Sequence, residues 1–231
     1  MLSLWFFCAM MVSLAFLTYF NLKVTYGMMI LFKTITSILF LCIAYATKRE
    51  AKNKTKTLYF RLMFLGLFFS LLGDVCMVIV GDSKGILFVL GVASFAFAHI
   101  SYLIAFFRFE KISRLNIIWS SAIFLFLFCL LNFSPCLDFQ GLKALLMVYA
   151  LLISLMVGKS FSLWKYRKEN SYFVYLTIGG AVLFLISDSI LLFNLFGPSS
   201  LWYLLAVNNV LYYIGQALFG LSFKNEFSLV K

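Results

Sequence analysis

The sequence predicts an all-α protein: a polytopic membrane bundle of eight transmembrane helices, arranged as two parallel four-helix repeats. Three observations lead to this fold class. The 231 residues are 64% hydrophobic with a mean hydropathy of +1.04, more apolar surface than a water-soluble domain of this size needs. Only two prolines occur, so few helices should be broken. Finally, eight apolar runs reach the length of about 20 residues that spans a bilayer.

The eight runs follow one another with short connections, and none of these connections is long enough for a soluble domain. We therefore expect residues 1–231 to form a single transmembrane domain. The predicted spans are 2–20, 26–46, 58–80, 86–107, 115–133, 140–163, 173–196 and 201–223.

The first run should be a retained helix, because it lacks the basic segment and the small-residue cleavage site of a signal peptide. The second run contains Lys33. The third and fourth contain Asp74 and His99, and the polar turn Gly81–Gly85 joins them. Ionisable groups inside a membrane are expensive, so each of them marks a candidate functional site.

The fifth and sixth runs carry few polar groups. Lys143 stands at an expected helix end, where its side chain can reach the membrane surface. The seventh run contains Asp188. The eighth contains Asn208 and Asn209, whose alternative role is helix–helix hydrogen bonding. It also contains Tyr212, Tyr213 and Gln216, which point inward only if the helix faces are oriented that way.

An internal repeat relates the two halves of the chain. Ser-Leu-Leu-Gly-Asp74 recurs as Phe-Leu-Ile-Ser-Asp188, and in the following runs the segment 99–102 takes the position of the segment 209–212. An offset of four helices makes the halves parallel, related by an axis along the membrane normal. Chance similarity of apolar segments is the alternative. The repeat halves are about 1–114 and 115–231.

The net charge of +11 is confined to particular loops, which indicates membrane topology rather than nucleic-acid binding. The positive-inside rule places both termini in the cytoplasm, in a bacterial inner (plasma) membrane. The opposite side holds only Lys23, Lys84 and Lys143. The cations of the cytoplasmic side are Lys48, Arg49, Lys52, Lys54, Lys56, Arg61, Arg108, Lys111, Arg114, Lys159, Lys165, Arg167, Lys168, Lys224 and Lys231.

Three charged residues are expected at one depth, roughly 10 Å below the outer surface: Lys33, Asp74 and Asp188. Equal depth is what a shared polar cavity needs, and an ammonium group offsets the cost of burying a carboxylate. The alternatives are a lysine that reaches up to the interface and aspartates that hydrogen-bond a neighbouring helix. His99 is expected deeper, at roughly 20 Å.

Small residues recur at helix-packing positions. Gly179 and Gly180 precede Asp188, and Gly215 and Gly220 line the eighth run. A face rich in small residues also allows a homodimer. No cofactor is expected, because one histidine cannot build a three-histidine metal site, and the five cysteines have no pairing framework.

Two motifs resemble the YhhN family of integral membrane proteins. The first is Gly73-Asp74 followed by Gly91-x-x-x-Phe95-x-x-Ala98-His99-x-x-Tyr102. The second is Gly180-Ala181-x-x-Phe184-x-x-Ser187-Asp188 followed by Tyr212-Tyr213-x-x-Gln216. Together they span about half of the chain. Lys33 matches a family lysine that is usually followed by proline, whereas Thr34 follows it here.

The resemblance implies a lysoplasmalogenase, which hydrolyses the vinyl-ether bond of a lysophospholipid to a fatty aldehyde and glycerophospho-ethanolamine or -choline. This chemistry needs an acid that is protonated near neutral pH and an anion beside the developing oxocarbenium ion. Asp74 and Asp188 are the candidate pair, in an order that the sequence leaves open. Lys33 would hold one carboxylate ionised or touch the phosphate. The residues expected to orient water and substrate are His99, Tyr102, Asn209, Tyr212, Tyr213 and Gln216.

Other classes of function stay open at this point. Parallel repeats with carboxylates inside the membrane also fit a proton-coupled transporter. A non-catalytic lipid-binding protein would tolerate loss of the aspartates. A serine triad of Ser101 or Ser187 with His99 lacks the nucleophile elbow of such enzymes.

Overall fold

The structure is a computed structural model that describes residues 1–51, 57–80, 85–139, 141–198 and 201–225. These ranges form eight α-helices, each long and apolar enough to cross a membrane, so the all-α polytopic bundle is confirmed. The helices are α1 (Leu2–Leu22), α2 (Tyr26–Glu50), α3 (Thr57–Val80), α4 (Ile86–Phe107), α5 (Arg114–Phe133), α6 (Lys143–Phe161), α7 (Ser171–Phe196) and α8 (Trp202–Leu221), and 3-10 turns η1 (Ser162–Tyr166) and η2 (Ser222–Asn225) extend α6 and α8.

Most predicted boundaries hold within two residues, and the two larger differences have local causes. Helix α2 runs on to Glu50, with Lys48 and Arg49 in its last turn, where cations favour the negative end of the helix dipole. The Glu50 carboxylate accepts from the N-terminal ammonium at 2.7 Å, which ties α2 to α1. Helix α6 begins at Lys143 rather than 140, because Gly141 has a φ of +81° that a helix cannot contain.

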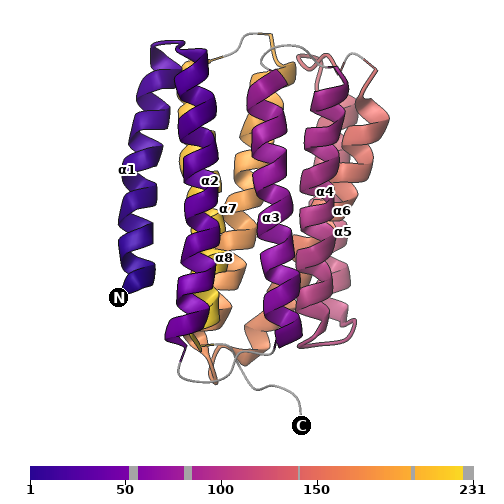
Figure 1. Ribbon diagram of the computed structural model, residues 1–231. Helices are drawn as coiled ribbons and strands as arrows, with labels where there is room; N and C mark the ends of the chain where they lie inside the picture. Colours follow the sequence, from indigo (N-terminus) through magenta and orange to yellow (C-terminus); the bar gives the residue numbers. More distant parts are fainter. Residues whose placement is uncertain (52–56, 81–84, 140, 199–200, 226–231) are drawn as a thin grey trace.

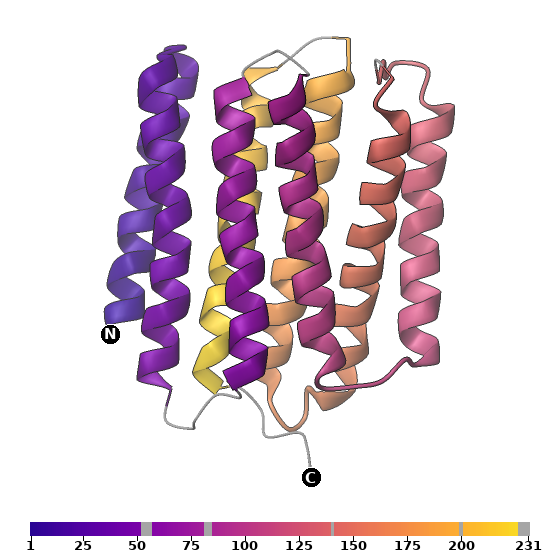
Figure 2. The same cartoon turned by 45° about the vertical axis from the view of Figure 1, so that its right-hand side comes forward.

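The helices stand side by side along one direction (Figure 1). The start of α1 and the end of α8 lie at the same end of the bundle, as an even number of spans requires. Figure 2 shows α1 and α5 at the two outer edges of the bundle, with the other helices between them.

The neighbours of α2 and α6 repeat at an offset of four, whereas the contact between α1 and α8 has no comparable counterpart between α5 and α4. Helix α2 packs against α1, α3 and α8, and α6 packs against α5, α7 and α4. Adding four to each helix number, and counting on from α1 after α8, turns α2 and its neighbours into α6 and its neighbours. This pattern of contacts is what the predicted parallel repeat requires.

Cations gather at the end that carries the N-terminus. Those in the described part of the chain are Lys48, Arg49, Arg61, Arg108, Lys111, Arg114, Lys159, Lys165, Arg167, Lys168 and Lys224. Lys23 and Lys143 are exposed at the other end. Lys52, Lys54, Lys56, Lys84 and Lys231 lie outside the described residues, as does the turn before Gly85. We call the lysine-poor end the outer end.

Helices α7 and α8 approach closely at two glycines. A Cβ on Gly180 would stand 2.9 Å from the carbonyl oxygen of Gly215, and one on Gly215 would stand 3.1 Å from that of Gly180. Backbones that come this close gain van der Waals contact, which drives helix association where lipid removes the hydrophobic effect. The predicted packing role of these two glycines is therefore met.

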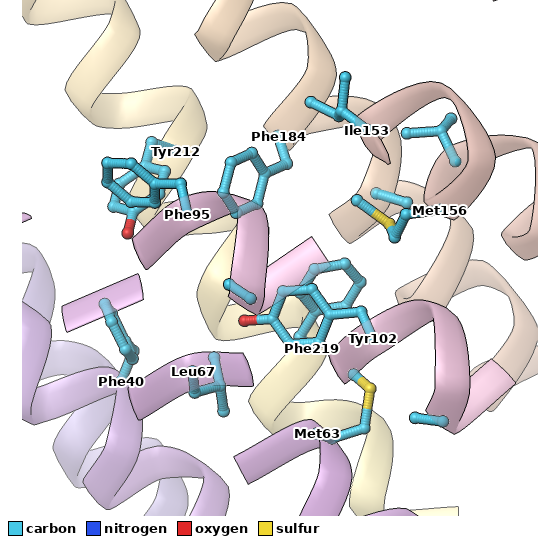
Figure 3. Packing of buried hydrophobic residues seen from close by; sticks show 14 of the residues in the cluster. Phe40, Met63, Leu67, Phe95, Tyr102, Ile153, Met156, Phe184, Tyr212 and Phe219 are labelled. Atoms are coloured by element: carbon cyan, nitrogen blue, oxygen red, sulfur yellow. The ribbon is translucent and has the colours of Figure 1, made fainter. Parts of the chain in front are cut away.

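The buried core between the helices is largely aromatic near the middle of the bundle. Phe95, Phe184 and Tyr212 meet edge to face, with ring centroids 5.3–6.3 Å apart (Figure 3). They come from α4, α7 and α8, so this contact fixes three helices on which the polar residues described below are carried.

Adjacent glycines offer a matched test of the α7–α8 contact. We expect Gly180→Ala to destabilise the protein by about 1–3 kcal/mol, because the new methyl group meets backbone. Gly179→Ala meets only the flexible end of Leu218, and its better helix propensity should leave stability equal or higher by up to about 1 kcal/mol. Thermal unfolding in detergent measures both, and equal melting temperatures would contradict the close contact.

Candidate active site

A narrow polar pocket lies in the outer half of the bundle, lined by residues of α2, α3, α4, α7 and α8. About 290 Å³ of space lies between its walls, counting the part that is open to the outside, and its charged wall consists of Lys33, Asp74 and Asp188. Three polar residues of α8 complete it: Asn208, Asn209 and Tyr212. The three ionisable residues that the sequence places at one depth therefore border one pocket.

Asp74 is almost fully enclosed, with 3% of its side chain exposed. Ser37 on α2 donates a hydrogen bond to Asp74 Oδ2 at 2.7 Å, and the Tyr212 hydroxyl donates to the same oxygen at 2.9 Å. The Lys33 ammonium lies 3.8 Å from Oδ1. Two donors and a cation form the environment of a carboxylate anion.

Lys33 turns into the bundle instead of extending to the membrane surface. Its side chain is only 17% exposed, and its charged end faces Asp74. The alternative in which the Lys33 side chain extends to the membrane surface is therefore not the conformation in the structure. Replacing one residue of such a buried ion pair with a neutral residue leaves the other charge buried without a partner.

Asp188 is held by a tyrosine and a histidine. The Tyr149 hydroxyl on α6 donates to Asp188 Oδ2 in a short hydrogen bond. The same hydroxyl lies 2.9 Å from His99 Nε2, and that nitrogen lies 3.9 Å from Asp188 Oδ2. The Tyr149 hydroxyl has one proton, which it donates to the Asp188 carboxylate. We therefore assign the hydrogen bond between His99 and Tyr149 to a proton on His99 Nε2, which donates to the hydroxyl oxygen. Nδ1 of this ring has no partner among the described residues, which fits this tautomer.

His99 and Asp188 meet although their backbone positions suggest different depths. Side chains on a helix lean toward its N-terminus. Helix α4 starts at the outer end, so His99 leans outward, whereas α7 starts at the opposite end, so Asp188 leans inward. This opposite lean shortens the separation of roughly 10 Å expected along the membrane normal, and the two groups come within 3.9 Å of each other.

Each aspartate is bound from the opposite half of the chain. Asp74, in the first half, accepts from Tyr212 of α8, and Asp188, in the second half, faces His99 of α4. Each also has a partner on the second helix of its own half, Ser37 on α2 or Tyr149 on α6. The contacts of the two carboxylates therefore connect the two halves of the chain in both directions.

Tyr149 and Ser37 were not among the residues expected at the site. Tyr149 is the single polar side chain between Lys143 and Ser154, which is a weak signal in a chain with 12 tyrosines. Ser37 looks like an ordinary helix-packing residue. Both hydroxyls donate to a carboxylate because α2 and α6 are rotated to point them toward it, and the sequence does not reveal this rotation.

Tyr102 and Gln216 form a separate cluster on the inner side of the pocket. The Tyr102 hydroxyl donates to Gln216 Oε1 at 3.0 Å, and Ser70 Oγ lies 3.4 Å from that hydroxyl. Neither residue borders the pocket. Their role in orienting substrate stays a prediction, and the contacts that the structure shows for them are those within this cluster.

The remaining predicted site residues divide between pocket and wall. Asn209 borders the pocket, as does Asn208, whose Nδ2 donates to the Ser187 carbonyl at 2.7 Å. The Tyr213 hydroxyl lies behind the pocket, 3.2 Å from Ser37 Oγ, and donates to the Lys33 carbonyl at 3.3 Å. Tyr213 thus holds the partner of Asp74 rather than the pocket itself.

The serine-triad alternative has no geometric support. Ser101 Oγ donates to the Phe97 carbonyl at 2.8 Å, and Ser187 Oγ donates to the Phe184 carbonyl at 2.7 Å. Both hydroxyls are engaged by their own helices, and His99 is engaged by Tyr149. A nucleophile needs its base within hydrogen-bond reach.

Comparison with known proteins adds a family. The model of the YhhN family matches residues 28–223, most of the chain and every residue of the pocket. No curated protein and no solved structure matches the chain.

The Lys33–Asp74 pair is testable by a double-mutant cycle. We expect Lys33→Met to lower the melting temperature, because it leaves a carboxylate buried without its cation, at a cost of about 3–5 kcal/mol. Adding Asp74→Asn should recover most of the loss, since both charges are then gone. Lys23→Met, at an exposed lysine of the same end, is the control. Equal effects of the two lysine substitutions would show that Lys33 is not paired.

Proposed function

This chain belongs to the YhhN family, and we propose that it is a membrane-embedded lysoplasmalogenase. It hydrolyses the vinyl-ether bond of a lysophospholipid and releases a fatty aldehyde and glycerophospho-ethanolamine or -choline. The observation that carries the proposal is the pair of aspartates on one enclosed pocket, each with its own set of partners.

Asp188 is the proton donor in this proposal. It is the more open of the two carboxyls, with 18% of its side chain exposed against 3% for Asp74. It also borders a second, apolar cleft. A vinyl ether joins an apolar chain to a polar head group, so its reacting carbons belong where apolar and polar walls meet.

The reaction then proceeds in three steps. Asp188 gives its proton to the β-carbon of the vinyl ether, and the α-carbon becomes an oxocarbenium ion. Water adds to that carbon and returns a proton to Asp188, which leaves a hemiacetal. The hemiacetal collapses as its hydroxyl proton moves to the glycerol oxygen, so that aldehyde and alcohol separate and the enzyme is regenerated.

Asp74 supplies the negative charge for the cation that forms. Ser37, Tyr212 and Lys33 hold it as an anion, so it need not take part in proton transfer. Preorganised charge beside a developing cation is worth more in the low-dielectric interior of a helix bundle than in bulk water. Tyr149 positions Asp188 by occupying Oδ2, which leaves Oδ1 for the substrate.

The proposed location is a bacterial inner membrane with both termini in the cytoplasm, on the basis of the positive-inside rule. The pocket then lies in the outer half of the membrane, within reach of lipids in the outer leaflet. Membrane lipids and the lysophospholipid substrate are the proposed partners.

A proton-coupled transporter is the competing function, favoured by the helix contacts that repeat between the halves. A carrier moves its substrate unchanged. Release of aldehyde by purified protein in detergent separates the two functions, because no membrane gradient exists there.

Substitution of either carboxyl tests the proposed chemistry. We expect Asp188→Asn and Asp74→Asn each to lower the rate of aldehyde release roughly 10²–10⁴-fold, because one removes the acid and the other the anion. Glu169→Gln, at an exposed loop position, is the control. Near wild-type rates in both aspartate variants would end the assignment.

Tyr149→Phe tests the positioning of Asp188. Loss of a hydrogen bond to a carboxyl should lower kcat about tenfold to hundredfold while KM stays near the wild-type value, because the tyrosine holds the acid rather than the substrate. Tyr175→Phe, on the exposed face of α7, serves as the matched control. An unchanged kcat, or a rise in KM alone, would contradict the positioning role.

A further inference from the structure

A second, larger cavity lies beside the polar pocket. It is a cleft bordered by residues of α3, α4, α5, α6 and α7 in the outer half of the bundle, with about 690 Å³ of space between its walls, counting the part that is open to the outside. Its walls include Val92, Leu127, Leu146, Ala150, Leu185 and Leu192. Tyr149, Asp188 and Ser189 are its only polar side chains among the described residues, and Ser189 Oγ already donates to the Leu185 carbonyl at 2.8 Å.

The cleft and the pocket meet at Asp188. Four residues border both cavities: Met77, Phe95, Asp188 and Leu191. A ligand that fills both spaces is therefore apolar in one part and polar in the other, with its junction at the carboxyl group. A single-chain phospholipid has this shape.

The length of the cleft suits one long chain. On α7 its lining runs from Leu185 to Phe196, which corresponds to about 16 Å along the helix. Helix α5 forms its outer wall with Leu127 and Leu131 and stands at the edge of the bundle (Figure 2). Helix α5 packs mainly against α6, so its other faces remain toward lipid.

We propose that this cleft binds the single unbranched hydrocarbon chain of a lysophospholipid, with the first carbons of the chain beside Asp188. The proposal deepens the proposed function and rests on it for the identity of the reacting bond. A chain that leaves the bilayer for the cleft moves from one hydrocarbon environment to another. Its fit therefore comes from shape and packing rather than from the hydrophobic effect.

The cleft also explains why Asp188 and Asp74 differ. Asp188 borders both the cleft and the pocket, whereas Asp74 borders the polar pocket alone. A chain in the cleft covers Asp188 from the apolar side and excludes water there. The head group then extends toward Lys33, Asn208 and Asn209.

The test is a photolabelling experiment that does not depend on turnover. The probe is a saturated 1-O-alkyl lysophosphatidylethanolamine with a diazirine in the middle of its chain. It lacks the vinyl double bond and is not hydrolysed by protonation of carbon. Purified wild-type protein in detergent is irradiated with the probe, and labelled peptides are identified by mass spectrometry.

We expect labels on the cleft walls of α5, α6 and α7, at residues such as Leu127, Leu146 and Ala150. Excess unlabelled lysophospholipid should remove these labels. Labels confined to lipid-facing residues such as Phe126 and Val148, which are 64% and 59% exposed, would overturn the proposal.

Two substitutions on α7 provide the matched comparison. Leu192→Trp fills the cleft, so its labelling should fall about tenfold or more. Ile186→Trp adds the same side chain on the lipid-facing side of the helix, where Ile186 is 43% exposed, and should leave labelling unchanged. Equal labelling of both variants would overturn the proposal. If Leu192→Trp does not fold, the wild-type label map still decides.

The same samples separate the two proposals. Cleft labelling by a wild-type protein that releases no aldehyde from a lysoplasmalogen supports the chain site and ends the proposed enzyme. Aldehyde release with labels outside the cleft ends the chain site and leaves the enzyme standing.

Discussion

The rest of the structure depends on keeping two carboxyl groups inside a membrane. A carboxylate in hydrocarbon is stable only with donors or a cation around it, and here these groups come from neighbouring helices. Asp74 draws them from α2 and α8, and Asp188 from α4 and α6. Six helices are therefore fixed by two side chains. Helices α1 and α5, which supply none of these partners, stand at the edges of the bundle.

The sequence predicts the spans and the charged residues of the pocket well, because both follow from the cost of polarity in lipid. Apolar runs end where charges begin, and Lys33, Asp74 and Asp188 stand out as charges inside such runs. Their common depth follows from counting residues along the helix. The glycine pair at 180 and 215 is likewise visible, since small residues mark close helix contacts.

What the sequence leaves hidden is the direction that each helix faces. Ser37 and Tyr149 are neutral residues in apolar helices, and only the rotation of α2 and α6 turns their hydroxyls toward the carboxyls. Tyr102 and Gln216 resemble site residues by type and spacing, yet they bond to each other away from the pocket. The meeting of His99 with Asp188 depends on the opposite lean of side chains on α4 and α7. The cleft is lined by residues of five helices, α3 to α7, so no local sequence pattern marks it.

In the proposed chemistry a carboxyl group inside the bundle protonates carbon, and hydrolysis in deuterium oxide labels the product of that step. The purified protein is incubated with a lysoplasmalogen in D₂O. The aldehyde is reduced to the alcohol, and the mass of the alcohol is measured by mass spectrometry. One deuterium is expected on the carbon next to the carbonyl, the former β-carbon of the vinyl ether. Aldehyde without that deuterium, or no aldehyde at all, would rule out protonation of carbon by this protein.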